Sequence, residues 1–307
     1  MPSIRARIFN SYIRLAIKRR KWGRDEHALA RRARRLFGAP RISQWLSVRG
    51  LVVRAAEGGG VAGEWISVPE PERHAIILYI HGGGYVSCSP ATHRPITAGL
   101  ARLTRLRVFS VDYRLAPEHR FPAAPDDVFA AYRYLTEQYP ASPIVVAGDS
   151  AGGGLTLGLL LRAKKAHVNM PACAVCFSAW TDMTGSGDSV SKNEGSDRMF
   201  YASTISDFAD AYLGSADREN AYASPVFGNF AGMPPVLFQV GSTEVLVDDS
   251  RRIHEKIAGG GGTSELQIFD AMFHSWQMGL GLLPEAGASM KNAADFIRRH
   301  TKPSIDE

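Results

Sequence analysis

The sequence predicts an α/β fold in which a mainly parallel sheet lies between helices. Its 307 residues are 45% hydrophobic and 21% charged, a globular composition that supports one large domain or two small ones. Short apolar runs of strand length alternate along the chain with longer helical segments. These runs are apolar almost throughout, which is typical of strands that helices cover on both faces.

The chain begins with a segment that predicts amphipathic helices. Residues 1–45 are expected to be helical, with an interruption near Gly23 and an end at Gly38-Ala39-Pro40. The segment would precede a main domain at 46–307.

The main domain is predicted to alternate strands with helices. Eight strands are expected, at 46–53, 63–68, 73–80, 107–113, 144–149, 172–178, 235–241 and 265–270. Helices are expected at 92–104, 124–138, 151–166 and 286–300. The alternation pauses over 182–224, where a helix at 203–213 indicates an insertion between strands rather than a second core.

Positive charge is concentrated near the N-terminus. The net charge is +6, but residues 1–54 hold 15 Lys and Arg against two acids, Asp25 and Glu26. Such a segment is compatible with binding to nucleic acid or to an anionic surface. The alternative is a solvated helical face, and we favour it because these apolar residues keep roughly helical spacing between the charges: Ile4, Ile8, Tyr12, Leu15 and Ile17. No nucleic-acid partner is expected.

No membrane span is expected, because no run of ~18 apolar residues occurs. A secretory signal is not expected either, because charged residues interrupt the apolar residues at the N-terminus: Arg5, Arg7, Arg14 and Lys18.

The three cysteines indicate core thiols. An odd number makes no complete disulfide framework, and Cys173 and Cys176 lie in PACAVCFSAW, which predicts a buried strand. No second pair of ligands accompanies them, so no metal is expected. Reduced thiols predict a cytoplasmic location.

The first chemical motif is Gly148-Asp149-Ser150-Ala151-Gly152, between a predicted strand and a predicted helix. This is the G-x-S-x-G pattern of a nucleophile elbow, in which the serine adopts a strained backbone. Side chains two positions before and after Ser150 would collide across the turn, so glycines are required there. The alternative is a glycine-rich structural turn.

The second motif is His81-Gly82-Gly83-Gly84-Tyr85, directly after a predicted strand. Glycines leave backbone N–H groups accessible, which suits an oxyanion hole and matches the HGGG-type loop. A phosphate-binding loop is the alternative, but no Gly-Lys-Ser/Thr follows.

Together these motifs resemble the hormone-sensitive lipase-like branch of the α/β-hydrolases. Further matching stretches are DYRLAPEH (112–119), FPAAPD (121–126), SPVF (224–227) and GMPP (232–235), so the resemblance spans roughly 60–280. It implies an α/β-hydrolase fold, an eight-stranded mainly parallel sheet with a helical cap, and a serine carboxylesterase that needs no cofactor. It also implies oxyanion donors at Gly83, Gly84 and Ala151, a bracing role for His81, and a homodimer through the edge strand near 265–270.

His274 is the expected general base. The α/β-hydrolase order is Ser, acid, His, so the base should follow the last strand, and His274 lies just past it. His254 and His300 fall in predicted helices and are expected at the surface. Activity should rise as the imidazole loses its proton, around pH ~6–7 if its pKa is unperturbed.

Glu244 is the expected acid of the triad. The resembled family usually has Asp-Pro-Leu-x-Asp here, and aligning Leu246 and Asp248 with that pattern places Glu244 on the catalytic aspartate, with Val245 in place of proline. Glutamate also occurs in triads. Asp248 is the alternative, although Asp248 and Asp249 are placed to cap the helix that follows.

The substrate pocket is expected between the N-terminal helices and the 182–224 insertion. Candidate wall residues in the insertion are Met199, Phe200, Tyr201, Phe208 and Tyr212, and just past the oxyanion loop Tyr85 and Cys88. The alternative for each insertion residue is packing inside the cap itself.

The resemblance suggests small hydrophobic esters with short to medium acyl chains. Lactone or amide hydrolysis remains an alternative on the same machinery. A non-catalytic ligand-binding receptor is a further alternative, which the presence of Ser150 and His274 argues against.

Overall fold

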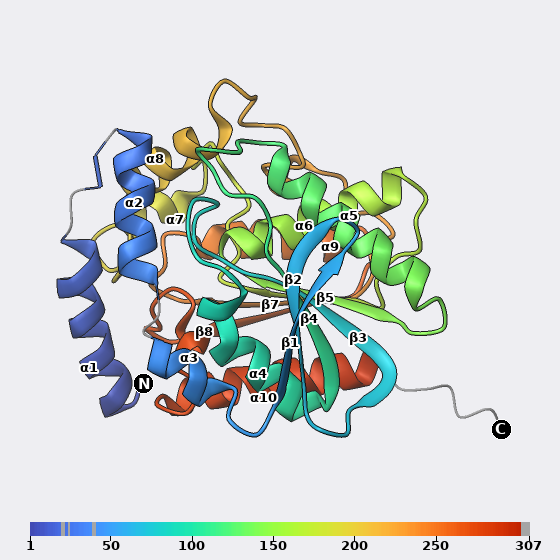
Figure 1. Ribbon diagram of the computed structural model, residues 1–307. Helices are drawn as coiled ribbons and strands as arrows, with labels where there is room; N and C mark the ends of the chain where they lie inside the picture. Colours follow the sequence, from blue (N-terminus) through green and yellow to red (C-terminus); the bar gives the residue numbers. More distant parts are fainter. Residues whose placement is uncertain (20–21, 24, 39–40, 302–307) are drawn as a thin grey trace.

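The computed structural model describes residues 1–19, 22–23, 25–38 and 41–301. Its centre is an eight-stranded sheet in the order β1-β2-β4-β3-β5-β6-β7-β8 (Figure 1). The strands are β1 (Val52–Gly58), β2 (Val61–Ser67), β3 (Glu72–Ile80), β4 (Leu106–Val111), β5 (Ile144–Asp149), β6 (Cys173–Phe177), β7 (Val236–Gly241) and β8 (Ser264–Phe269). Strands β4 to β8 join β3 in parallel, and only the β1–β2 and β2–β4 pairs are antiparallel. The predicted α/β fold is confirmed.

Helices cover both faces of this sheet. One face packs against α4 (Arg94–Thr104) and α10 (Pro284–Thr301), and the other against α5 (Ala123–Gln138), α6 (Ala151–Lys165) and α9 (Val247–Gly259). Successive residues of a strand point to opposite faces, so Ile77 and Tyr79 join one core while Ile76 and Leu78 join the other. This double burial explains why β5, β6 and β7 are apolar and buried along nearly their whole length.

A second helical layer comes from two distant parts of the chain. Its helices are α1 (Ile4–Ile13) with the π-helical turn Arg14–Lys18, α2 (Glu26–Phe37), α7 (Asp188–Lys192) and α8 (Ala202–Leu213), and we refer to them as the cap. Trp22, between α1 and α2, packs edge-on against Phe208 of α8 with ring centroids 5.2 Å apart. Figure 1 shows α2 and α8 at the same end of the molecule.

The predicted strand at 46–53 is wrong in its first half. Residues 41–47 form a short helix, α3 (Arg41–Ser47), which packs beside α4, and Gly50 turns the chain at a φ of +79° before β1 begins. Strand β1 instead extends to Gly58, and Gly59-Gly60 joins it to β2 as a two-residue hairpin loop with both φ values positive. Such loops favour glycine, and this signal was missed. Of the predicted end at Gly38-Ala39-Pro40, Ala39 and Pro40 lie outside the described residues; α2 ends at Phe37.

Helix α1 and the π-helical turn after it expose Arg5, Arg7 and Arg14, as a solvated charged face predicts, but they do not bury most of the apolar residues of the predicted pattern. The buried residues of α1 are Ala6 and Asn10, and Phe9, Ile13 and Ile17 pack inward beside them. The remaining apolar residues of the predicted pattern are exposed: Ile4, Ile8, Tyr12 and Leu15. Solvent therefore meets apolar side chains as well as charges on this helix.

Across the described ranges, no helix combines the length and the apolar character that crossing a membrane would need.

Candidate active site

Ser150 lies on the sharp turn between β5 and α6, with a φ of +53° and a ψ of −121°. Gly148 and Gly152 allow the chain to make this turn because they carry no side chain. A Cβ added at Gly148 would lie 2.4 Å from the Gly152 carbonyl oxygen, and one at Gly152 would lie 2.0 Å from the Ile80 carbonyl oxygen. The expected collision is therefore present, and a non-glycine residue in this backbone conformation carries strain of about 1–3 kcal/mol.

Three peptide groups near Ser150 have their carbonyl oxygens held by hydrogen bonds. The Gly82 carbonyl lies 2.7 Å from His81 Nδ1, and the Gly83 carbonyl accepts from the Ser87 hydroxyl at 2.7 Å and from the Ser87 N–H at 3.1 Å. The Ser150 carbonyl accepts from the N–H groups of Gly154 and Trp180. In a planar trans peptide the next N–H points the opposite way. The N–H groups of Gly83, Gly84 and Ala151 are thereby fixed in orientation.

His81 supports this loop in a neutral form. The side chain is fully buried and stacks on Tyr113 with ring centroids 4.3 Å apart, and the Tyr113 hydroxyl donates to the His81 carbonyl oxygen. Burial lowers the pKa of His81 to about 3. A neutral ring can donate from Nδ1 to the Gly82 carbonyl without placing a charge in the core.

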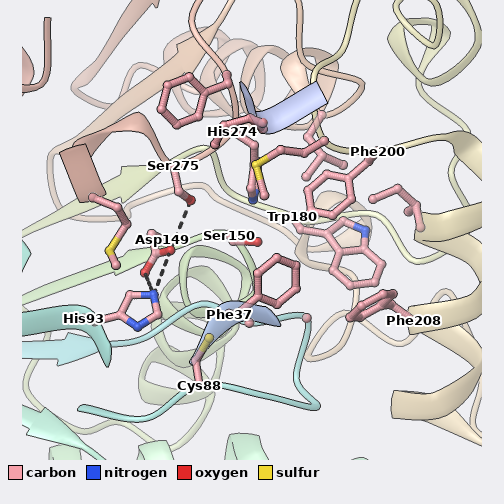
Figure 2. A pocket seen from close by; sticks show the side chains of 18 residues that line it. Phe37, Cys88, His93, Asp149, Ser150, Trp180, Phe200, Phe208, His274 and Ser275 are labelled. Carbon is pink, nitrogen blue, oxygen red and sulfur yellow. Dashed lines mark hydrogen bonds and ion pairs between the residues drawn. The ribbon is translucent and has the colours of Figure 1, made fainter. Parts of the chain in front are cut away.

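His274 follows β8 and is bound to the predicted acid. Its Nδ1 lies 2.7 Å from Glu244 Oε2, and both side chains are buried. Burial alone would lower the pKa of His274, but the hydrogen bond and the charge of Glu244 outweigh it and raise the pKa. Nε2, the other ring nitrogen, is buried without a hydrogen-bond partner among the described residues. In Figure 2 the ring points from its loop toward Ser150.

Glu244 is held in place beyond β7. Its Oε1 accepts from the Ser178 hydroxyl at 2.8 Å and from the Gly241 N–H at 2.6 Å, which leaves Oε2 for His274. The alternative acid, Asp248, instead accepts from the Ser189 N–H and contacts Arg251. The structure therefore joins His274 to Glu244.

The predicted capping role of Asp248 and Asp249 is wrong for their own helix. Asp248 accepts from the N–H of Ser189 at the start of α7, and Asp249 accepts from Thr181 and Asp182. Helix α9 has no side-chain cap hydrogen bond. Both residues lie in the first turn of α9, but their carboxylates accept hydrogen bonds from other segments of the chain instead of from α9.

Asp149 connects the two halves of the site, a role that was not predicted from the sequence. One carboxylate oxygen accepts from the Tyr79 hydroxyl at 2.7 Å and the Gly82 N–H at 2.9 Å. The other accepts from the Ser275 hydroxyl at 3.1 Å, and His93 Nε2 lies 3.3 Å away. Burial opposes its charge, but His93, the Tyr79 hydroxyl and the Gly82 N–H hold the pKa of Asp149 well below its usual range. The position of Asp149 directly before Ser150 in the G-x-S-x-G motif was the signal in the sequence that could have indicated this role.

A cavity of about 220 Å³ brings these groups together (Figure 2). Ser150 and His274 lie in its wall, with Gly83 and Gly84 of the loop. Its predicted apolar wall residues are Cys88, Met199, Phe200 and Phe208. Its unpredicted wall residues are Ile13, Phe37, His93, Asp149, Trp180, Ile205, Leu246, Phe273, Ser275 and Met278.

Three predicted pocket residues do not line this cavity. Tyr85 and Tyr212 stack on each other with ring centroids 3.8 Å apart and are both buried where α8 meets the His81–Tyr85 loop. Tyr201 is 40% exposed, and the Lys18 ammonium lies 4.4 Å from its ring centre. Tyr212 therefore packs against Tyr85 and Phe121, which lie outside the cap, and neither the predicted pocket role nor packing within the cap itself describes it.

The cysteines are free thiols, and Cys173 and Cys176 lie buried in β6. In the part of the chain that the structure describes, no cluster of three or more His, Cys, Asp or Glu side chains is arranged to hold a metal ion.

Comparison with known proteins places this site in a family. A family model described as the alpha/beta hydrolase fold matches residues 77–278. The chain is 36% identical over 244 residues to an acetyl-hydrolase of Streptomyces hygroscopicus, covering 79% of this chain and 81% of that protein. It is 33% identical to an esterase of Acinetobacter venetianus, covering 80% and 81%. A crystal structure of an esterase from the bacterial hormone-sensitive lipase family superposes with a TM-score of 0.89 at 32% identity, covering 98% of this chain and 99% of that one.

The protein is therefore an α/β-hydrolase. Within that class, the chain belongs to the hormone-sensitive lipase-like family and is a carboxylic ester hydrolase.

Proposed function

We propose that the protein is a serine carboxylesterase with Ser150 as nucleophile, His274 as general base and Glu244 as the acid that orients it. The single observation that carries the proposal is the hydrogen bonding of the two nitrogens of the His274 ring. Glu244 binds one ring nitrogen at 2.7 Å, while the other, Nε2, has no hydrogen-bond partner in the described chain and belongs to a residue in the same cavity wall as Ser150.

The reaction follows from these positions. Nε2 of His274 takes the Ser150 proton as the serine oxygen attacks the ester carbonyl, and the Glu244 charge stabilises the imidazolium. The carbonyl oxygen becomes an oxyanion that the N–H groups of Gly83, Gly84 and Ala151 bind. His274 then protonates the leaving alcohol, which departs and leaves an ester of Ser150. Water gives a proton to His274, attacks this acyl-enzyme and releases the acid, and the proton returns to Ser150.

We propose short to medium acyl chains as the substrates. The cavity volume of about 220 Å³ is below the ~300–1,000 Å³ usual for small-molecule pockets. Its side walls are mostly apolar, with Phe200, Phe208 and Trp180 among them, which favours a compact hydrophobic ester. We also propose that residues 1–45 and 182–224 form a cap on a catalytic domain at 46–307, and that the cap contributes to this wall through Ile13 and Phe37 from the first segment and Met199, Phe200, Ile205 and Phe208 from the second.

A series of p-nitrophenyl esters from acetate to laurate tests the proposal. We expect kcat/KM to be highest between acetate and octanoate, and to fall by at least about 10⁴-fold in Ser150→Ala. Parallel assays with lactones and amides distinguish the alternative substrates. Undiminished hydrolysis by Ser150→Ala, with contaminating esterase excluded, would refute the assignment of the nucleophile.

Two further proposals concern location and assembly. The free thiols support a reducing, cytoplasmic location. Strand β8 is the last strand of the sheet in the described chain, so its outer edge is available for a homodimer. Light scattering on wild type and on Ile268→Lys tests this dimer: a monomeric wild type contradicts it, and a dimer lost in the variant supports it.

A further inference from the structure

The outward face of α1 and of the π-helical turn that continues it carries an apolar stripe. Ile4, Ile8, Tyr12 and Leu15 are between 57% and 74% exposed, although Ala6, Asn10 and Ile13 already hold the opposite face of the helix against the molecule. A helix that only packs on a core presents polar residues outward. Clustered exposed apolar side chains instead mark a surface that binds something.

Arginines flank this stripe on both sides. At about 100° per residue, Arg5 falls on one side of the Ile4–Ile8–Tyr12 row, and Arg7 and Arg14 fall on the other. All three arginines are exposed. An apolar row between rows of cations is the pattern of a helix that lies in the plane of a lipid interface, with the row among the acyl chains and the cations at the headgroups.

We propose that α1 docks the protein onto the surface of an anionic phospholipid bilayer. The charge of the segment fits this partner, because residues 1–54 hold 15 Lys and Arg against two acids. The acidic groups that contact the start of the helix are already engaged, Asp270 with the Met1 amine and Glu285 with Ser3. Helix α3 adds Ile42, Trp45 and Leu46 to the exposed apolar residues of the same N-terminal segment.

Two other occupants fit the surface less well. A second copy of this chain would bring two arginine-flanked stripes together, and their like charges would repel. Nucleic acid would use the arginines but would leave Ile4, Ile8 and Leu15 without a role.

The helix is fixed to the body close to the proposed active site. Glu285 accepts from the Ser3 N–H at 2.6 Å, and the Asn10 side chain donates to the Ala271 carbonyl at 2.8 Å, three residues before His274. Ile13, at the end of the same helix, lines the cavity. Docking through α1 would therefore hold the cavity wall at the lipid surface.

Vesicle sedimentation of the full chain tests this docking. The vesicles are phosphatidylcholine alone, or phosphatidylcholine with about one third phosphatidylglycerol. We expect the wild type to bind the anionic vesicles and to lose affinity with added salt. Ile8→Ser with Tyr12→Ser should weaken binding by at least about tenfold. Arg7→Gln with Arg14→Gln should weaken it by about fivefold per arginine.

Matched controls separate docking from folding. Ile8→Leu with Tyr12→Phe should bind as the wild type does, as should Leu103→Ser, which removes an exposed apolar side chain elsewhere. Hydrolysis of a soluble p-nitrophenyl ester should be unchanged in every variant, because none of these residues lines the cavity. The docking site is refuted if wild type does not sediment, if the serine variant binds equally well, or if phosphatidylcholine alone binds as strongly. It is also refuted if the serine variant instead converts a dimer to a monomer without vesicles.

Discussion

The Asp149 carboxylate accepts a hydrogen bond from the Ser275 hydroxyl at 3.1 Å. Asp149 directly precedes Ser150, and Ser275 directly follows His274. The same carboxylate binds the Gly82 N–H at 2.9 Å, beside the proposed oxyanion donors. One buried acid thus connects the loops that carry the proposed nucleophile, base and oxyanion hole.

Asp149→Asn should lower kcat by about 10–100-fold with a smaller change in KM, because displaced groups lose catalytic geometry more than ground-state binding. Steady-state kinetics on p-nitrophenyl butyrate measures the split. Ser275→Ala removes a single contact of the network and should cost less. In the double variant the combined loss should be smaller than the sum of the two single losses, because both single variants remove the Asp149–Ser275 hydrogen bond. Two results together would contradict this positioning role. The loss of kcat in each variant would only follow its loss of stability, and the two single losses would add fully in the double variant.

Glu244→Gln should lower kcat/KM by about 10³–10⁴-fold, because a neutral amide no longer stabilises the His274 imidazolium. Asp248→Asn is the matched control and should stay within about threefold of wild type, since Asp248 contacts Ser189 and Arg251 instead. Both variants are assayed on the same ester with circular dichroism as a folding check. A large loss in Asp248→Asn with none in Glu244→Gln would reverse the assignment of the acid.

The acid limb of the pH profile of kcat/KM should lie above pH ~6.5, the ordinary value for histidine. The reason is that Glu244 raises the pKa of His274, and only the deprotonated ring can accept the Ser150 proton. Activity is therefore lost as the pH falls through this raised value. In Glu244→Gln the residual activity should show its limb at lower pH, because burial then acts on the ring without the opposing charge. An acid limb that stays at the same pH in Glu244→Gln as in the wild type would contradict this effect of Glu244 on the pKa of His274.

Gly84→Ala should reduce kcat by about 10²-fold, a loss typical of a disturbed oxyanion donor. The added Cβ would lie 2.3 Å from the Phe208 ring, and the φ of +62° adds strain. Phe208→Ala in the same chain should restore part of the activity, because it removes the atom that clashes. The two single variants and the double variant are compared by kcat. If Phe208→Ala recovers no activity in the Gly84→Ala protein, the steric contact with Phe208 is not the cause of the loss.

The two glycine motifs could be interpreted from the sequence because each encodes its own local geometry. Gly148 and Gly152 are required by a turn of five residues, so the pattern alone predicts the turn. The order of strands likewise predicts that His274 follows the last strand.

The cavity wall could not be predicted in the same way. Ile13, Phe37 and Phe273 come from three separate segments, and only tertiary packing brings them together. The outward face of α1 was misjudged for a related reason. Periodicity shows that a helix has apolar positions, but it does not say which of two apolar rows meets the body. The row of Ala6, Phe9 and Ile13 meets the body, with the Asn10 side chain beside it.

The contact between Trp22 and Phe208 sets an order for biosynthesis. The partner ring is added long after the tryptophan, so the first helices leave the ribosome well before the surface that they cover exists. The contact with Phe208 therefore cannot form until about two thirds of the polypeptide has been made, and the cavity wall, which includes Phe273, cannot close before that point.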